Sequence, residues 1–178
     1  MKFDFKKNIL PHILIILSFH LVLVFYFSDH FMKGETIKQD DIVSYRGMAK
    51  ESMDFRKENP GETAFWINNM FSGMPNYMID VDYNQYNYVH FVRNILNPFG
   101  IDHPVKLSLV GLLCMYVLLL SLRVNKYIAA IGAFAYTFGS FFFISFQAGH
   151  TSKIEAMYLA CLVLAGVIYI YERKNQTS

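Results

Sequence analysis

The chain alternates between long apolar runs and polar connections. Four runs carry at most one charged residue each, and they cover residues 9–27, 105–122, 127–146 and 154–171. Each has roughly the 20 residues that an α-helix needs to cross the hydrocarbon core of a bilayer. The pattern therefore predicts an all-α polytopic membrane protein with four transmembrane helices. The first run exceeds the apolar region of a signal peptide, so it is interpreted as an uncleaved anchor.

Composition supports this class of protein. Of the 178 residues, 54% are hydrophobic and only 17% are charged, against about a quarter charged in soluble domains. The net charge of +2 is too small to indicate a nucleic-acid partner. Cys114 and Cys161 both fall inside apolar runs, which predicts buried, unpaired thiols rather than a disulfide framework.

The basic residues predict the orientation of the helices. In a four-helix count, the lysines and arginines of the short connections fall on one side of the membrane: Lys2, Lys6, Lys7, Arg123, Lys126, Arg173 and Lys174. That side is expected to be cytoplasmic, with both termini. The predicted organisation is an N-terminus with the first helix (1–27), an extracytoplasmic loop domain (28–104) and the remaining three helices (105–178).

The outer loop is expected to be folded, because aromatic residues run through it. Ile42, Tyr45, Ala49 and Met53 recur at helical spacing, which predicts an amphipathic helix that ends at the turn residues 59–62. Residues 89–96 predict a second short helix. Both helices are expected to lie along the membrane surface.

Small residues line the third predicted span at helical spacing. They are Ala129, Gly132, Ala133, Gly139 and Ser140. Small side chains let helices approach closely in lipid, so this face predicts a helix-packing surface.

Asp40 and Asp41 are the leading candidates for chemistry. They begin the amphipathic helix just outside the membrane, where a carboxylate can act as a general base or hold a divalent cation. The alternative is structural, since acidic residues at a helix start cap it and complement its dipole.

A second candidate is the turn between the third and fourth spans. His150 and Lys153 could bind a phosphate or diphosphate there, helped by amides at the start of the next helix. The alternative is an ordinary polar hairpin in which Lys153 and Glu155 snorkel or pair. Glu155 is notable because an ionisable group near the membrane is costly without a role.

A third candidate is the aromatic and amide-rich segment 65–77. Trp66 and Asn68 are the side-chain types that often hold sugars and lipid head groups. The same pattern also builds the core of a small folded loop, and this interpretation is favoured for Trp66 and Phe71.

Three motifs resemble the start of the YfhO-type bacterial membrane proteins, which belong to the GT-C class of glycosyltransferases. They are Gln39-x-Asp41-Ile-Val-x-x-x-Gly47-Met-Ala-Lys-Glu51, Trp66-x-Asn68-x-Met70-Phe-x-Gly73-Met-Pro and Ala148-Gly-His150-x-x-Lys153. The resemblance extends from the first helix to the fourth. Members of that family have many more helices, so the chain is expected to be the amino-terminal part of a longer protein or a truncated relative.

The resemblance implies an enzyme of the bacterial plasma membrane that uses polyprenyl-phosphate sugars on its outer face. By position, Asp41 matches the family acid, which acts as catalytic base or as ligand to a divalent cation such as Mg²⁺ or Mn²⁺, and Asp40 lies in a variable neighbouring place. His150 and Lys153 match a turn that would face the same cavity, where they are expected to hold the donor phosphate. The acceptor would be a cell-surface polymer or lipid.

Two other classes of function remain open at this point. One is a non-catalytic membrane scaffold or lipid-handling subunit, in which the acidic pair only stabilises a helix. The other is a transporter, which is disfavoured because the spans contain few buried charges or broken helices.

Overall fold

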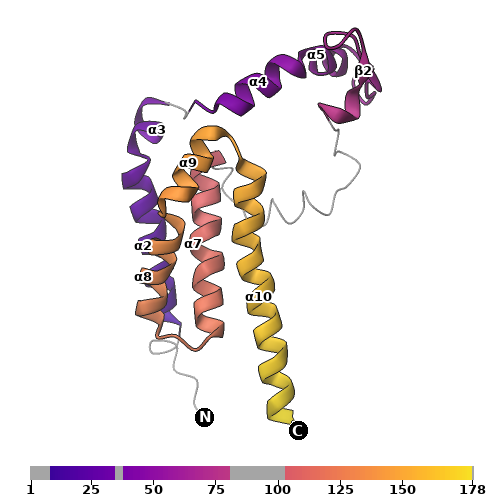
Figure 1. The fold of residues 1–178 in the computed structure, drawn as a ribbon. Coiled ribbons are helices and arrows are strands. Elements are labelled where there is room, and N and C mark those ends of the chain that lie inside the picture. Colours follow the sequence, from indigo (N-terminus) through magenta and orange to yellow (C-terminus); the bar gives the residue numbers. More distant parts are fainter. Residues whose placement is uncertain (1–8, 35–37, 81–102, 178) are drawn as a thin grey trace. The chain divides into compact units, whose positions relative to one another are not determined.

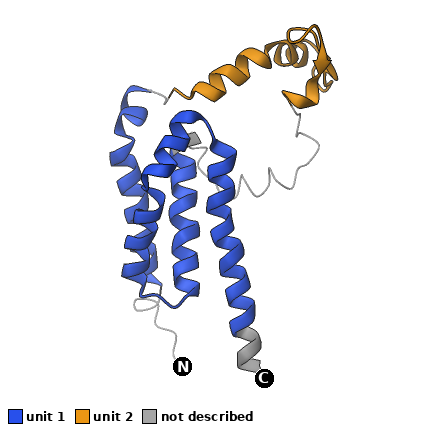
Figure 2. Ribbon diagram, viewed as in Figure 1, with its two compact units in different colours: residues 1–37, 100–178 blue, residues 38–99 orange. Residues whose placement is uncertain are grey.

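The computed structural model describes residues 9–34, 38–80 and 103–177. The chain divides into two compact units (Figure 2). Unit 1 combines residues 1–37 with residues 100–178, and unit 2 comprises residues 38–99. The helix predicted over residues 89–96 lies outside the described residues. The described chain is mostly helical, as the apolar runs predict, with one short β-hairpin.

Unit 1 is a bundle of helices built around α7 (Figure 1). Its described elements are α2 (Leu10–Tyr26), α3 (Ser28–Lys33), α7 (His103–Ser121), α8 (Lys126–Thr137), α9 (Ser140–Ala148) and α10 (Thr151–Thr177). Helix α7 packs against α8, α10 and α2, so it forms the centre of the bundle. A salt bridge of 3.0 Å between Arg123, just after α7, and Glu172 on α10 joins two of these helices.

Close packing in unit 1 depends on small residues, as predicted. Ala129 and Ala133 on α8 are fully buried. A Cβ atom built on Gly132 would lie 2.7 Å from Leu119 on α7, and one on Gly111 would lie 2.7 Å from the ring of Tyr158 on α10. A side chain at Gly111 would therefore displace the Tyr158 ring, while one at Gly132 would displace only the end of the Leu119 side chain. Cys114 and Cys161 are buried and free, as their positions predict.

Polar and aromatic contacts also join the helices of unit 1. The hydroxyl of Tyr116 on α7 lies 2.7 Å from Nδ1 of His12 on α2. Phe19 packs edge-on against the rings of Tyr116 and Phe134, with centroids 5.7 and 5.1 Å away. These rings tie α2 to α7 and α8 through the core of the unit.

The outward face of unit 1 is also apolar. Leu14, Leu17 and Leu21 on α2 are more than half exposed, as are Ile131 on α8 and Ile170 on α10. Among the described residues, one helical segment, Thr151–Glu172, is long and apolar enough to cross a membrane. Helices α2 and α7 are apolar but shorter. A helix that is hydrophobic on all sides belongs in a core or in lipid.

The predicted third span is broken rather than continuous. Helices α8 and α9 meet at an angle of 41°, and together they have the length and composition of one span. Gly139 separates the two helices with an extended backbone (φ −62°, ψ 140°), a conformation outside the helical region. The expectation of an unbroken helix over residues 127–146 is therefore wrong at this glycine.

Unit 2 contains two helices, a hairpin and a 3-10 turn. They are α4 (Asp40–Met48), α5 (Lys50–Glu58), β1 (Trp66–Ile67), β2 (Met74–Pro75) and η1 (Asn76–Met78). Strands β1 and β2 are antiparallel, with Trp66 opposite Pro75. The predicted amphipathic helix is present as α4 and α5, which are interrupted only at the buried Ala49.

The predicted core role of Trp66 and Phe71 is wrong. Trp66 is 56% exposed and Phe71 is 84% exposed, whereas Ile67, Ser52 and Asn76 occupy the buried centre of unit 2. The reason is the period of two along a strand: Ile67 points inward, so its neighbour Trp66 must point outward. Gly73 allows the indole to fold across the hairpin, because a Cβ there would lie 2.7 Å from Nε1 of Trp66.

Candidate functional site

Asp40 and Asp41 are both exposed on the first turn of α4. The N-cap residue is Gln39, whose side chain makes no capping hydrogen bond. The two carboxylates therefore lie in the first helical turn, where the helix dipole favours negative charge. The side chain of Asp40 is 79% exposed and lies 3.6 Å from Nζ of Lys38. Both carboxylates are accessible to a reactant from solvent.

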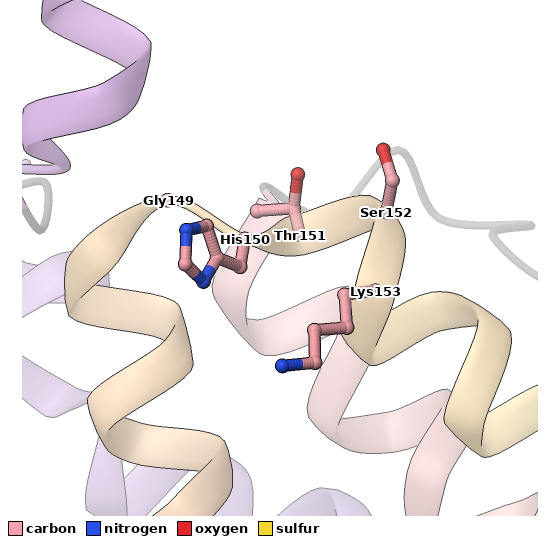
Figure 3. Close-up of a pocket in the computed structure, with 5 residues that line it drawn as sticks. All are labelled: Gly149, His150, Thr151, Ser152 and Lys153. Carbon is pink, nitrogen blue, oxygen red and sulfur yellow. The ribbon is translucent and has the colours of Figure 1, made fainter.

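His150 and Lys153 line a shallow hollow of about 320 Å³ at the start of α10 (Figure 3). Gly149 ends α9 in the left-handed conformation (φ 96°), and the amides of Gly149 and His150 both donate to the carbonyl of Ser145. This tight turn requires glycine, and it places the His150 ring and the Lys153 side chain on the lining of one hollow.

The hollow has the elements of an anion site. The first hydrogen bond of α10 is donated by the amide of Ile154 to the backbone carbonyl of His150. The amides of Ser152 and Lys153 precede that bond at the positive end of the helix. In the structure the ammonium of Lys153 lies 5.1 Å from the centre of the Phe141 ring. The hydroxyls of Thr151 and Ser152 point away from His150 and Lys153 (Figure 3). Glu155 is half-buried one turn into α10.

Trp66 and Asn68 lie on and beside the hairpin of unit 2. The backbone amides of Asn68 and Asn69 each donate to Oε2 of Glu51 over 2.9 Å. The side-chain amide of Asn68 lies 3.4 Å from the other oxygen of Glu51. Asn68 is thus held against α5, while Trp66 is 56% exposed.

The predicted residues fall into two groups. Asp40, Asp41, Trp66 and Asn68 belong to unit 2, while His150 and Lys153 belong to unit 1. Within the described ranges, no group of three or more His, Cys, Asp or Glu side chains is placed to hold a metal ion.

Among the described residues of unit 2, Asp80 is the most buried charged group, and no sequence pattern indicated it. Asp80 is 4% exposed, and its carboxylate accepts hydrogen bonds from the hydroxyl of Tyr45 and from Arg56. Burial first, and then the hydrogen bond and negative charge of Asp80, raise the pKa of Tyr45 above its ordinary value of 10.0. These partners lie far apart in the sequence, so spacing alone gave no signal for the cluster.

Comparison with known proteins finds no relative of the chain. No protein-family model, curated protein or solved structure matches the chain.

Proposed function

We propose that the chain is the amino-terminal part of a bacterial membrane glycosyltransferase-like protein of the GT-C type. It would transfer a sugar from a polyprenyl-phosphate donor to a cell-surface polymer or lipid. The observation that carries this proposal is the exposed acidic pair Asp40–Asp41, which begins a helix of a polar unit inserted between apolar helices. The proposal also draws on the resemblance of the three sequence motifs.

The membrane part of the proposal draws on the apolar outer face of unit 1. Four spans would be formed by α2, α7, the bent pair α8–α9 and α10. Exposed leucine and isoleucine side chains on several helices would be costly in water but are suited to lipid. The bend at Gly139 is tolerable in a membrane where neighbouring helices surround it. In this arrangement unit 2 lies on the outer side and both termini are cytoplasmic.

Asp41 is assigned the role of general base or cation ligand. A base must reach the proton that it removes, and the exposure of Asp41 permits an acceptor hydroxyl to approach. Asp40 is the second candidate, since by position it is Asp41 that matches the acid of the family that the motifs resemble. A divalent cation would need further oxygen ligands from the substrate or water.

His150 and Lys153 are assigned to the donor phosphate. The imidazole of His150 and the ammonium of Lys153 line one hollow beside the first amides of α10, and these groups match the needs of a phosphate group. Lys153 would exchange its contact with the Phe141 ring for the phosphate. In unit 2, the exposed indole of Trp66 offers a stacking surface for a sugar, and Asn68 lies next to it.

A non-catalytic scaffold or lipid-handling subunit is the second candidate. The observation that favours it is the place of Asp40 and Asp41 in the first turn of α4, where acidic residues stabilise a helix without further function. In that case both carboxylates could be neutralised at a cost of about 1 kcal/mol or less.

An Asp41→Asn variant distinguishes the two candidates. Membranes from cells that lack the native copy would be supplied with a polyprenyl-phosphate donor carrying a labelled sugar. The enzyme proposal predicts a loss of transfer of about 100-fold or more, the usual contribution of a general base. Asp54→Asn on α5 is the matched control, because Asp54 is also exposed and pairs with Lys57 over 3.4 Å. Full transfer by Asp41→Asn at normal abundance would favour the scaffold.

Binding of the donor can be tested separately. Polyprenyl phosphate is expected to raise the unfolding temperature of the detergent-solubilised chain, and the double variant His150→Ala, Lys153→Ala should lose that shift. Lys126→Ala is the control, because Lys126 also begins a helix and lies 5.5 Å from an aromatic ring, that of Tyr127. An equal rise in the unfolding temperature of the double variant would contradict the assignment of His150 and Lys153 to the donor phosphate.

A further inference from the structure

The hairpin of unit 2 exposes large apolar side chains. Phe65, Trp66, Phe71, Tyr77 and Met78 are between 56% and 85% exposed. These five residues are called the hairpin apolar surface below. Aromatic residues bury much area when they find a partner, so leaving four of them in water is costly. A small folded unit that presents such side chains is expected to bury them against an apolar partner, either a protein surface or a lipid membrane.

Several polar groups of the same hairpin have partners within unit 2. Glu51 on α5 accepts the amides of Asn68 and Asn69, and the side-chain amide of Asn69 donates to the carbonyl of Met48 over 2.8 Å. The side-chain amide of the buried Asn76 donates to Ser52 and to the carbonyl of Ala64. Because these amide donors have partners within unit 2, moving the hairpin out of water does not leave them unsatisfied.

Charged residues are absent from the hairpin sequence. No Asp, Glu, Lys or Arg occurs between Glu62 and Asp80. A surface for a charged protein partner would usually carry complementary charges at its rim. An uncharged surface rich in Trp, Tyr, Phe and Met is instead typical of the interface between lipid head groups and acyl chains.

The backbone at the hairpin tip gives an independent indication. Phe71 and Ser72 have φ values of 49° and 60°, in the left-handed region that favours Gly and Asn. A phenylalanine at such a position is unfavourable for the turn, and its ring is exposed, so the fold of unit 2 gains little from it. Strain at an exposed apolar residue is a reason to look for function.

We propose that the hairpin apolar surface inserts into the lipid interface of the bilayer that contains unit 1. This inference rests on the proposed membrane location of unit 1. Both ends of unit 2 are covalently joined to unit 1, so the bilayer is present at high effective concentration. This departs from the expectation that α4 lies along the membrane surface. The contact is assigned to the hairpin because the exposed residues of α4 include Asp40, Asp41 and Arg46.

The chain carries its own probe, because Trp66 is its sole tryptophan. The full chain would be reconstituted into vesicles of phosphatidylcholine and phosphatidylglycerol, with or without bromine on the acyl chains. Bromine quenches an indole at short range, so the emission of Trp66 is expected to fall by about half if the ring sits at head-group depth. Unchanged emission would overturn the proposal.

Two control variants place the tryptophan elsewhere after Trp66→Phe. Val43→Trp, on the exposed side of α4, should be quenched little; quenching equal to that of Trp66 would contradict a contact specific to the hairpin. Phe25→Trp, on the outward face of α2, should be quenched strongly. If Phe25→Trp is quenched and Trp66 is not, the proposed lipid contact of the hairpin fails while the membrane location of unit 1 stands. If neither is quenched, the membrane location of unit 1 fails as well.

A Phe71→Asn variant tests the surface without a change in fold. Asn suits the left-handed backbone, so the stability of unit 2 should be equal or higher. Quenching of Trp66 in brominated vesicles should nevertheless decrease, because one of the inserting side chains is gone. Unchanged quenching would show that Phe71 is not part of the lipid contact and would contradict the surface as defined.

Discussion

The hydroxyl of Tyr45 donates a hydrogen bond of 2.6 Å to Oδ1 of Asp80, and Arg56 binds the other carboxylate oxygen. Tyr45 lies on α4, Arg56 on α5, and Asp80 follows η1. The buried carboxylate therefore links three elements of unit 2. Since α4 also carries Asp41, this link holds the helix on which the proposed chemistry depends.

Removal of Arg56 should destabilise unit 2. Arg56→Met leaves the carboxylate of Asp80 buried without its cation, which is expected to cost about 3 kcal/mol of unfolding free energy. Lys57→Met is the control: its pair with Asp54 is exposed, and its loss should cost about 0–1 kcal/mol. Urea unfolding of the full chain in detergent, followed by Trp66 emission, reports on unit 2. Equal costs for the two variants would contradict a structural role for the Arg56–Asp80 pair.

Tyr45 should make the stability of unit 2 depend on pH in the alkaline range. Its folded pKa is raised above 10.0, first by burial and then by Asp80, so the folded state holds the phenol proton more tightly than the unfolded state. The resulting stabilisation is complete below pH 10 and is lost as the pH rises through the folded pKa. Tyr45→Phe should remove this part of the pH dependence.

The pH experiment has a matched control in Tyr77→Phe, because the ring of Tyr77 is exposed on η1. Unfolding free energies measured by urea titration at several pH values would be compared for both variants. At neutral pH, Tyr45→Phe should also cost about 1–3 kcal/mol, since a carboxylate loses a hydrogen-bond donor. If the unfolding free energy of Tyr45→Phe still falls with pH in the alkaline range, a group other than Tyr45 is responsible for that dependence.

Gly111→Ala should weaken the packing of α7 on α10. The added Cβ would lie 2.7 Å from the Tyr158 ring, which is fully buried. Overpacking of this kind costs about 1–3 kcal/mol. Gly166→Ala is the control, because nothing lies within 4 Å of its Cβ, and it should be neutral or stabilising. Thermal unfolding followed by helical circular dichroism would separate the two variants.

The sequence predicted the helices well because apolar runs and small-residue spacing are local signals. Ala129 and Ala133 were predicted to allow close packing, and both are fully buried. The break at Gly139 was missed, since one glycine in an apolar run is compatible with a continuous helix. The exposure of Trp66 and Phe71 depends on which hairpin face covers α5, and that is decided by contacts distant in sequence.

The sequence indicated which residues are candidates for the site but not how they are arranged in space. The place of Asp40 and Asp41 at a helix start follows from local pattern, and the structure has them in the first turn of α4. The glycine turn before His150 was also visible as a local signal. The Tyr45–Asp80 link could not be predicted, because no periodic pattern connects two residues separated by a hairpin. The catalytic and binding roles themselves remain predictions.

The orientation of the chain across a membrane is the most direct test of the account. In a background with Cys114→Ala and Cys161→Ala, single cysteines would be placed at three exposed positions, Ser44, Asn125 and Ser152. A membrane-impermeant maleimide applied to intact cells stripped of their outer envelope should label Ser44→Cys and Ser152→Cys. It should label Asn125→Cys only after the membrane is opened. Labelling of Asn125→Cys in sealed cells, or protection of the other two, would contradict a four-span protein with unit 2 outside.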